Sequence, residues 1–208
     1  MRCHLLRLRP PGGGPFGVAR GLVAAAVVLA LAATPALAAE EMALSPDLQV
    51  PILLKILTYD RNLESRAGAE LIVGIVYAPP DPQSVKGANE VSDQFYRFAG
   101  KTVKRLPVRY LLVEYTTPEN LERSVATRGI DVLYVAPGNA QNLAGITKVS
   151  QARSITTTTG VPEYVRRGIS VGVGSSQDRA QILINLTSSR AEGCEFDASL
   201  LRIATILK

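Results

Sequence analysis

Few side chains in this sequence combine a reactive type with the spacing that catalysis or metal binding requires. The only histidine, His4, lies within the first 38 residues, so the rest of the chain has no imidazole for acid–base catalysis or metal ligation. The carboxylates Asp60, Asp81 and Asp131 are scattered, without the spacing of a catalytic pair or of a site for a hard metal ion. We therefore expect a protein that is not an enzyme and that uses no cofactor or metal.

Two further motifs are weak candidates for chemistry. Gly172-Val173-Gly174 begins like a dinucleotide-binding fingerprint, but residue 177 is Gln and the segment lies between two expected strands. Cys194 stands between Glu192 and Glu195, and neighbouring negative charge disfavours a reactive thiolate. The only other cysteine is Cys3, so we expect Cys194 to be a structural thiol, with an intermolecular disulfide as the alternative.

The clearest charge cluster is basic, and we call it the basic stretch. Arg97, Lys101, Lys104, Arg105 and Arg109 fall within thirteen residues that contain no acid. One interpretation is a solvated helix end and loop. The other is a docking surface for an acidic partner or for anionic headgroups.

A second candidate docking surface is an apolar patch at the turn between Tyr59 and Leu63, because aromatic anchors often dominate protein interfaces. The expected partner-binding residues on the two surfaces are Tyr59, Arg61, Arg97, Lys101, Lys104 and Arg105.

The overall charge argues against nucleic acid as a partner. The chain has 23 basic and 18 acidic residues, but the first 38 residues contain four arginines and no acid. The remainder is therefore almost neutral, and it lacks the positive footprint of a nucleic-acid-binding domain.

The first 38 residues have the pattern of an export signal. A basic segment precedes twelve apolar residues, Leu22–Ala33, and Ala36-Leu37-Ala38 provides the small residues that a signal peptidase needs. Twelve residues are too few to cross a bilayer, which takes about 20, although an uncleaved membrane anchor is the alternative. We expect cleavage near Ala38, a periplasmic location and one domain over residues 39–208.

The elements that must position these residues alternate between strands and helices. The expected strands cover residues 71–77, 108–115, 130–135, 154–159, 169–173 and 180–186. The expected helices cover residues 48–57, 84–98, 117–127, 139–149, 162–167 and 199–207. This alternation predicts an α/β three-layer sandwich with a mostly parallel sheet, and the last two strands are spaced as an antiparallel hairpin.

In an open α/β sheet, ligands bind beyond the carboxyl ends of the strands. Here that rim is formed by residues 77–81, 115–119, 136–139 and 160–162. The sequence does not indicate what would bind there.

The C-terminal part of the chain resembles the YfiR/HmsC-like family of exported bacterial proteins. The resemblance rests on a strand that ends in Ile184-Asn185-Leu186, a short helix, a glycine and a terminal helix with the pattern S-x-L-L-x-x-A. Its signature residues are Asn185, Gly193, Leu200, Leu201 and Ala204.

This resemblance implies regulation. Well-understood members of the family are periplasmic repressors that bind the periplasmic part of an inner-membrane diguanylate cyclase, lower cyclic-di-GMP output and restrain biofilm formation. The expected partner is thus such a cyclase or another membrane-bound sensor, and a homodimer is a further expectation. A module that binds a small molecule or peptide, like one lobe of a solute-binding protein, is the alternative.

Overall fold

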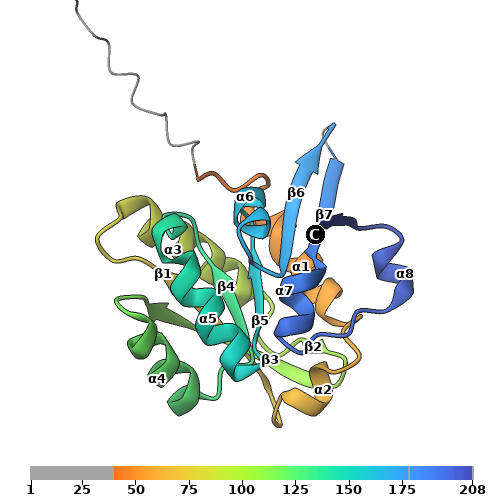
Figure 1. Cartoon of the computed structure of the whole chain (residues 1–208), viewed down its shortest axis with the longest axis horizontal. Helices are drawn as coiled ribbons and strands as arrows, with labels where there is room; N and C mark the ends of the chain where they lie inside the picture. Colours follow the sequence, from red (N-terminus) through yellow and green to blue (C-terminus); the bar gives the residue numbers. More distant parts are fainter. Residues whose placement is uncertain (1–39, 178, 208) are drawn as a thin grey trace, which may run out of the picture. The chain divides into compact units, whose positions relative to one another are not determined.

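The computed structural model describes residues 40–177 and 179–207, which include an eight-stranded sheet (Figure 1). The strand order is β2-β3-β1-β4-β5-β6-β7-β8. Neighbours from β3 to β6 run parallel, whereas β2 with β3 and β6 with β7 are antiparallel. The bounds are β1 Leu71–Tyr77, β2 Thr102–Val103, β3 Leu106–Glu114, β4 Val132–Val135, β5 Thr156–Thr159, β6 Val171–Ser176, β7 Arg179–Asn185 and β8 Thr205–Leu207.

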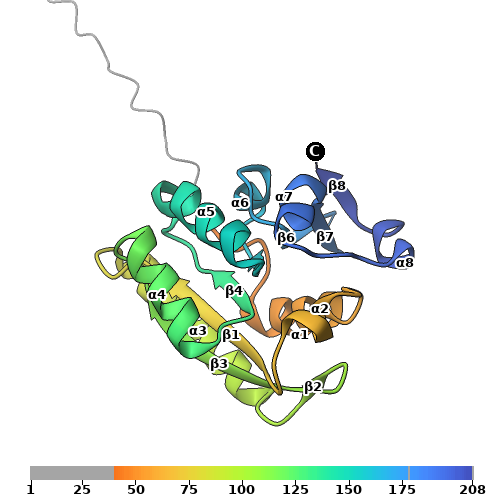
Figure 2. The same ribbon diagram turned by 60° about the horizontal axis from the view of Figure 1, so that its bottom comes forward.

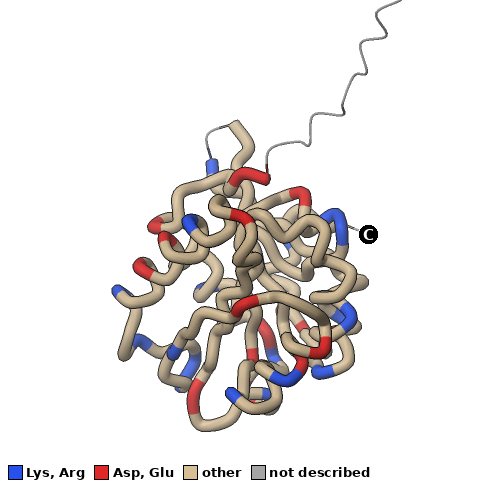
Figure 3. Tube along the Cα trace, turned by 90° about the vertical axis from the view of Figure 1, so that its left-hand side faces the viewer, with Lys and Arg blue, Asp and Glu red and all other residues tan. Residues whose placement is uncertain are grey.

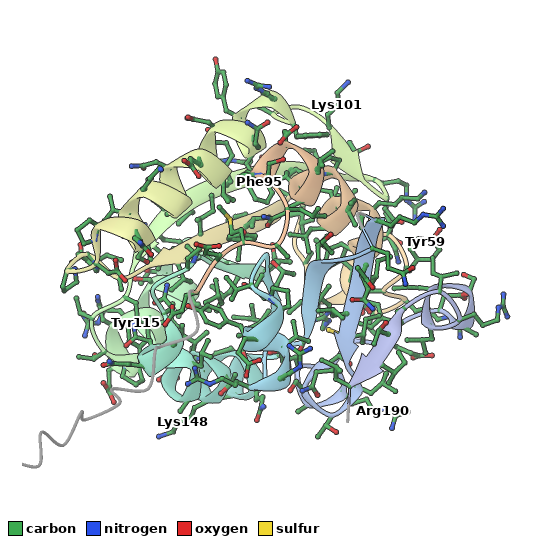
Figure 4. All side chains as sticks on the ribbon, turned by 90° about the horizontal axis from the view of Figure 1, so that it is seen from above. Tyr59, Phe95, Lys101, Tyr115, Lys148 and Arg190 are labelled. Carbon is green, nitrogen blue, oxygen red and sulfur yellow. The ribbon has the colours of Figure 1, made fainter. Side chains whose placement is uncertain are left out.

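Helices cover both faces of this sheet and enclose two apolar cores. Helices α1 (Pro46–Leu57) and α3 (Pro82–Arg97) pack on one face. The other face carries α4 (Pro118–Arg128), α5 (Leu143–Arg153) and α6 (Pro162–Arg166). Figure 4 shows α3 and α5 on opposite sides of the strands. The predicted three-layer α/β fold, with its mostly parallel sheet, is confirmed.

The central strands are buried because neither face of the sheet reaches solvent. In β1, Val73 and Ile75 belong to one core and Val76 to the other, which explains the unbroken apolar run. Strand β5 is also fully buried, although it consists of four threonines. Its hydroxyls are satisfied: Thr158 Oγ1 donates to the Leu133 carbonyl at 3.2 Å and Thr159 Oγ1 to the Val135 carbonyl at 2.9 Å.

Proline marks the start of several helices. Pro82, Pro118 and Pro162 occupy the first turns of α3, α4 and α6, where a missing N–H costs nothing. The side chain of Asp81 caps α3 by accepting from the Gln83 and Ser84 amides. Helix α3 therefore begins two residues earlier than the sequence alone predicts.

The expected terminal helix over residues 199–207 is wrong. The structure has a single turn, α8 (Ala198–Leu201), followed by β8, which pairs in parallel with β7 (Figure 2). A helix through residue 207 needs an apolar face to bury, but the Ile203 side chain is 69% exposed. Strand β8 instead satisfies backbone groups along the edge of β7.

The predicted hairpin is confirmed, with bounds that differ from those expected over residues 169–173 and 180–186. Strands β6 and β7 extend into the expected turn and project beyond the neighbouring strands (Figure 1). Two further short elements were missed, α2 (Leu63–Arg66) and β2. The helix expected over residues 139–149 begins with the 3₁₀ turn η1 (Ala140–Asn142), and α7 (Leu186–Ala191) is the short helix of the family signature.

Residues 1–38, where the sequence predicts an export signal, lie outside the described residues, as does Ala39. Within the part of the chain that the structure describes, no helix has the length and apolar character needed to cross a membrane.

Candidate functional site

An apolar groove lies between α1, β7 and α8, and we call it the α1–α8 groove. It has a volume of about 260 Å³, and Lys55 is the only charged residue that lines it. The lining residues are Pro51, Ile52, Lys55, Ile56, Tyr59, Ile182, Leu200 and Ile203. Because solvent-accessible apolar surface is costly unless a partner covers it, this groove is the strongest candidate for protein binding.

Tyr59 closes one end of the groove, and its position is set by contacts with α1 and the C-terminal segment. The Lys55 ammonium lies 5.6 Å from the centre of the Tyr59 ring, within cation–π range. The Tyr59 carbonyl accepts a hydrogen bond from the Asp197 amide at 2.9 Å. Asp60 and Phe196 form an isolated antiparallel bridge beside it. The turn that carries Tyr59 is thus joined to the segment that leads into α8.

A buried ion pair supports this junction. The Asp60 side chain has no exposure and pairs with the Arg66 guanidinium, while its Oδ1 accepts from the Glu195 amide at 2.9 Å. Arg66 also donates to the carbonyls of Ser154, at 2.8 Å, and of Glu192, at 3.1 Å. Arg66 therefore connects the start of the folded chain to its end. No pattern in the sequence indicates this arrangement, because Ser154, Glu192 and Glu195 are far along the chain from Asp60 and Arg66.

Cys194 lies at the same junction and is buried. Its sulfur is 3.2 Å from Thr156 Oγ1 and 3.7 Å from a guanidinium nitrogen of Arg66. Burial raises the pKa of the Cys194 thiol to about 12, despite the hydrogen bond from Thr156 and the charge of Arg66. The geometry is that of an unreactive structural thiol.

The signature residues also have structural roles here. The Asn185 carboxamide caps α7 by accepting from the Ser188 amide at 3.0 Å and donates to the Val165 carbonyl at 3.0 Å. Gly193 has a φ of +77°, a conformation that glycine adopts without strain. Leu200 is buried, whereas Leu201 and Ala204 are only partly buried.

Glu192, which precedes that glycine, was missed as a key residue. Its carboxylate is completely buried and accepts from the Ser150 hydroxyl at 2.7 Å, from the Thr157 hydroxyl at 2.7 Å, from the Thr157 amide at 2.9 Å and from the Ser170 hydroxyl. Burial raises the pKa of this carboxyl. It joins the end of α7 to α5 and β5.

Arg61 does not line the groove. Its guanidinium pairs with Asp197 at 2.7 Å and with Glu195 at 3.4 Å, and its side chain is 58% exposed. A partner that contacts Arg61, as the sequence predicts, must therefore extend beyond the groove to the surface beside Tyr59.

The basic stretch is largely paired with acids from other parts of the sequence. Arg105 lies 3.2 Å from Glu64, Lys104 lies 3.8 Å from the same carboxylate, and Arg109 lies 3.0 Å from Glu70. Arg97 and Lys101 are exposed, and among the described residues neither forms an ion pair within 4.0 Å.

The two predicted docking surfaces meet at Lys104, but other members of the two surfaces lie apart. Lys101 and Tyr59 occupy separate parts of the molecule in Figure 4. On the side drawn in Figure 3, basic and acidic residues are interspersed. The charge of the basic stretch is thus reduced by its neighbours. Lys101 lies apart from Tyr59, whereas Lys104 reaches the turn that carries Tyr59, because its ammonium donates to the Asp60 carbonyl at 2.6 Å.

The rim at the carboxyl ends of the strands contains a second pocket, which we call the rim pocket. It has a volume of about 590 Å³ and is lined by residues that follow β1, β3 and β4, including Ala78, Tyr115 and Gly138. This is the rim that the sequence singles out. Beneath it, the buried Asn139 side chain donates to the carbonyls of Ala136, at 3.0 Å, and Val76, at 3.3 Å.

Within the described residues, no group of three or more histidine, cysteine, aspartate or glutamate side chains is arranged to hold a metal ion.

Two solved structures share this fold. A conserved domain protein from Vibrio cholerae O1 biovar El Tor superposes with a TM-score of 0.55 and 14% identity, over 79% of this chain and 61% of that one. An ABC domain from Streptococcus pneumoniae in complex with L-Trp gives 0.54 and 13%, over 79% and 60%. The chain thus spans about three fifths of the length of each structure.

No curated protein matches the sequence. The model of the YfiR/HmsC-like family, however, matches residues 79–205, which is more than half of the chain. The matched range includes most of the residues that line the rim pocket, the buried Glu192 with its hydrogen-bond donors, and α8. This chain belongs to the YfiR/HmsC-like family.

Proposed function

We propose that this protein is a periplasmic regulator that binds the periplasmic part of an inner-membrane signalling protein, and that the partner is a diguanylate cyclase which it represses. Membership of the YfiR/HmsC-like family supports a periplasmic regulatory role in general. The partner and the effect on cyclic-di-GMP and biofilm formation are our proposal. The function is binding rather than catalysis.

The observation that carries the proposal is the α1–α8 groove. Tyr59 and Ile203 flank an apolar hollow of about 260 Å³, a size that suits one large apolar side chain from a partner. The ion pair of Asp60 with Arg66 and the backbone contacts of Tyr59 hold the groove's parts together before a partner arrives. A preformed pocket lowers the entropy lost on binding.

The proposal predicts a specific pattern in the native host. Deleting the gene should raise cyclic-di-GMP, and the wild-type gene should restore it. A Tyr59→Ala variant should fail to restore repression, because it removes the aromatic wall of the groove. Tyr96→Ala is the matched control: this tyrosine is 71% exposed and lies on α3.

Variants must accumulate to wild-type levels in the export compartment for this comparison to count. If deletion leaves cyclic-di-GMP unchanged, the cyclase assignment fails. If Tyr59→Ala and Tyr96→Ala repress equally well, the groove is not the docking surface.

A second function is favoured by the rim pocket. A cavity of about 590 Å³ is large enough for a small molecule, and it lies where α/β sheets bind ligands. The Streptococcus pneumoniae domain of the same fold is described in complex with L-Trp. Native mass spectrometry of protein purified from the periplasm tests this alternative, since a retained small molecule would support it and an empty protein would not.

A further inference from the structure

The first described residues of the chain cross the rim of the sheet, and we call residues 40–45 the N-terminal strap. The Ala43 amide donates to the carbonyl of Gly160, just beyond β5, at 3.0 Å. The Leu44 carbonyl accepts from the buried Gln49 carboxamide, whose oxygen accepts from the Tyr134 hydroxyl at 2.9 Å. The strap therefore rests on the carboxyl ends of the strands.

At the start of this strap, the Glu40 carboxylate enters a small cluster of donors. It accepts from the hydroxyl of Tyr164 and from the Ala140 amide, the latter at 3.3 Å. The Arg167 guanidinium donates to the Ala140 carbonyl at 2.6 Å, and its positive charge acts on the Tyr164 hydroxyl by lowering its pKa. We call these three groups, the Tyr164 hydroxyl, the Ala140 amide and the Arg167 guanidinium, the Tyr164 site.

The Tyr164 hydroxyl is held in the orientation that suits a carboxylate. Tyr164 is 1% exposed, and its oxygen accepts from the Asn139 amide at 2.8 Å. Its own proton is therefore available to an acceptor above it, and Glu40 supplies one. Burial and the bond to Glu40 both raise the pKa of Tyr164, which keeps the hydroxyl protonated as a donor.

Glu40 also separates two cavities. It lines the rim pocket of about 590 Å³ and a second pocket of about 490 Å³ that lies between the strap and α3. Withdrawal of this side chain would expose the Tyr164 site to both spaces. The rim pocket has acidic walls, because Asp81 and Glu114 line it. The second pocket is lined by Glu41 and by Glu90, which pairs with Lys86 at 3.8 Å.

We propose that the Tyr164 site binds small organic monocarboxylates, that Glu40 occupies it as an internal substitute, and that a ligand carboxylate displaces the N-terminal strap. The donors match one carboxylate, and the acidic walls around them repel a second negative charge on a ligand. Ligand binding would change the position of the strap. The surface that the strap forms would therefore differ between the free and the ligand-bound protein. This proposal does not depend on the docking partner.

Propionate is the direct probe, because it reproduces the end of the glutamate side chain. In a Glu40→Ala variant the site is vacant, so propionate should bind and raise the melting temperature, whereas neutral propionamide should not. Wild-type protein should bind propionate roughly tenfold or more weakly, because a tethered carboxylate competes at high effective concentration. Glu41→Ala removes the neighbouring exposed carboxylate and should behave as wild type.

The site of binding is measured by the amide resonance of Ala140 in nuclear magnetic resonance spectra. Propionate should shift this resonance in Glu40→Ala, and adding Tyr164→Phe should abolish the shift in a protein whose circular dichroism confirms that it is folded. Succinate, with its second charge, should bind more weakly than propionate. In the wild type, saturating propionate should speed amide hydrogen exchange in residues 40–45.

The proposal is overturned if propionate fails to bind Glu40→Ala. It is also overturned if propionate, propionamide and inorganic phosphate give the same shifts, because the anion would then be adventitious. If the variant with both Glu40→Ala and Tyr164→Phe does not fold, the Glu40→Ala variant provides the test by itself. A resonance of Ala140 that propionate does not shift in that variant would contradict binding at the Tyr164 site.

Discussion

The backbone N–H of Asp197 donates to the carbonyl of Tyr59 at 2.9 Å, which joins the end of α1 to the beginning of α8. Asp197 belongs to the C-terminal segment in which the family resemblance is strongest. Through this bond, that segment supports Tyr59, whose side chain lines the α1–α8 groove. The groove is therefore assembled from both ends of the folded chain. Its integrity should depend on residues that do not touch a partner.

Arg66 is the first of these residues. Arg66→Met should lower the free energy of unfolding by about 3–5 kcal/mol, because it leaves the buried Asp60 carboxylate without its partner. Urea unfolding followed by circular dichroism measures the loss. Arg61→Met is the control: it breaks two exposed ion pairs, and it should cost much less stability than Arg66→Met. Equal losses for the two variants would contradict the supporting role of Arg66.

The C-terminal leucines should differ in their importance. Leu200 is 1% exposed, so Leu200→Ala should destabilise the fold by about 2–5 kcal/mol. Leu201 is only partly buried, and Leu201→Ala should cost clearly less, in contrast to the result expected for a terminal helix that closes the core. Denaturant melts of the two variants decide, and a larger loss for Leu201→Ala would favour the helix.

The reason that the sequence misleads at this end is physical. Leu200, Ile203, Ala204 and Leu207 recur at helical spacing, but periodicity does not reveal which surface is available for packing. Strand β7 leaves an open edge, and residues 205–207 satisfy it. By contrast, the apolar run of β1 and the prolines before α4 and α6 are local signals, and they predict the three-layer fold correctly.

The candidate site was predictable to a lesser degree. Tyr59 was identified by residue type, and the rim by the general behaviour of parallel sheets. The pairing of the basic stretch with Glu64 and Glu70 was not visible, because the partners are far apart in the sequence. Arg105, in the turn before β3, pairs with Glu64 of α2. Arg109 of β3 pairs with Glu70, just before β1. Glu40 and Tyr164 were also missed, since only the tertiary fold brings them together.

Glu192 should make stability depend on pH. Burial raises the pKa of its carboxyl in the folded protein above the ordinary value of 4.5. Protonation then favours the folded state, so the contribution is fully present below about pH 4.5 and is lost as the pH rises through the folded pKa. As the pH rises above about 4.5, the melting temperature should fall more steeply for the wild type than for Glu192→Gln.

Some slope should remain in Glu192→Gln, because burial also raises the pKa of Asp131. The exposed Glu41 provides the control, and Glu41→Gln should retain the wild-type slope. If the melting temperature depends on pH in the same way for the wild type and for Glu192→Gln, Glu192 does not titrate in the pH range above about 4.5.

Cys194 should resist thiol reagents in the folded protein. Its burial and its pKa of about 12 leave almost no accessible thiolate at neutral pH. Iodoacetamide should label the native protein slowly and the urea-unfolded protein quickly, as measured by mass spectrometry. Rapid labelling of the native state would mean that the junction around Arg66 opens readily.

The most direct test of the central claim is site-specific photo-crosslinking in the native host. A photoreactive amino acid replaces Ile203, which is 69% exposed at the groove, or Tyr96, which is 71% exposed on α3, and the captured proteins are identified by mass spectrometry. We predict that position 203 captures a membrane signalling protein through its periplasmic part, that Tyr59→Ala abolishes this capture, and that position 96 does not capture that protein. Capture of no membrane protein from position 203, or equal capture from both positions, would contradict the account.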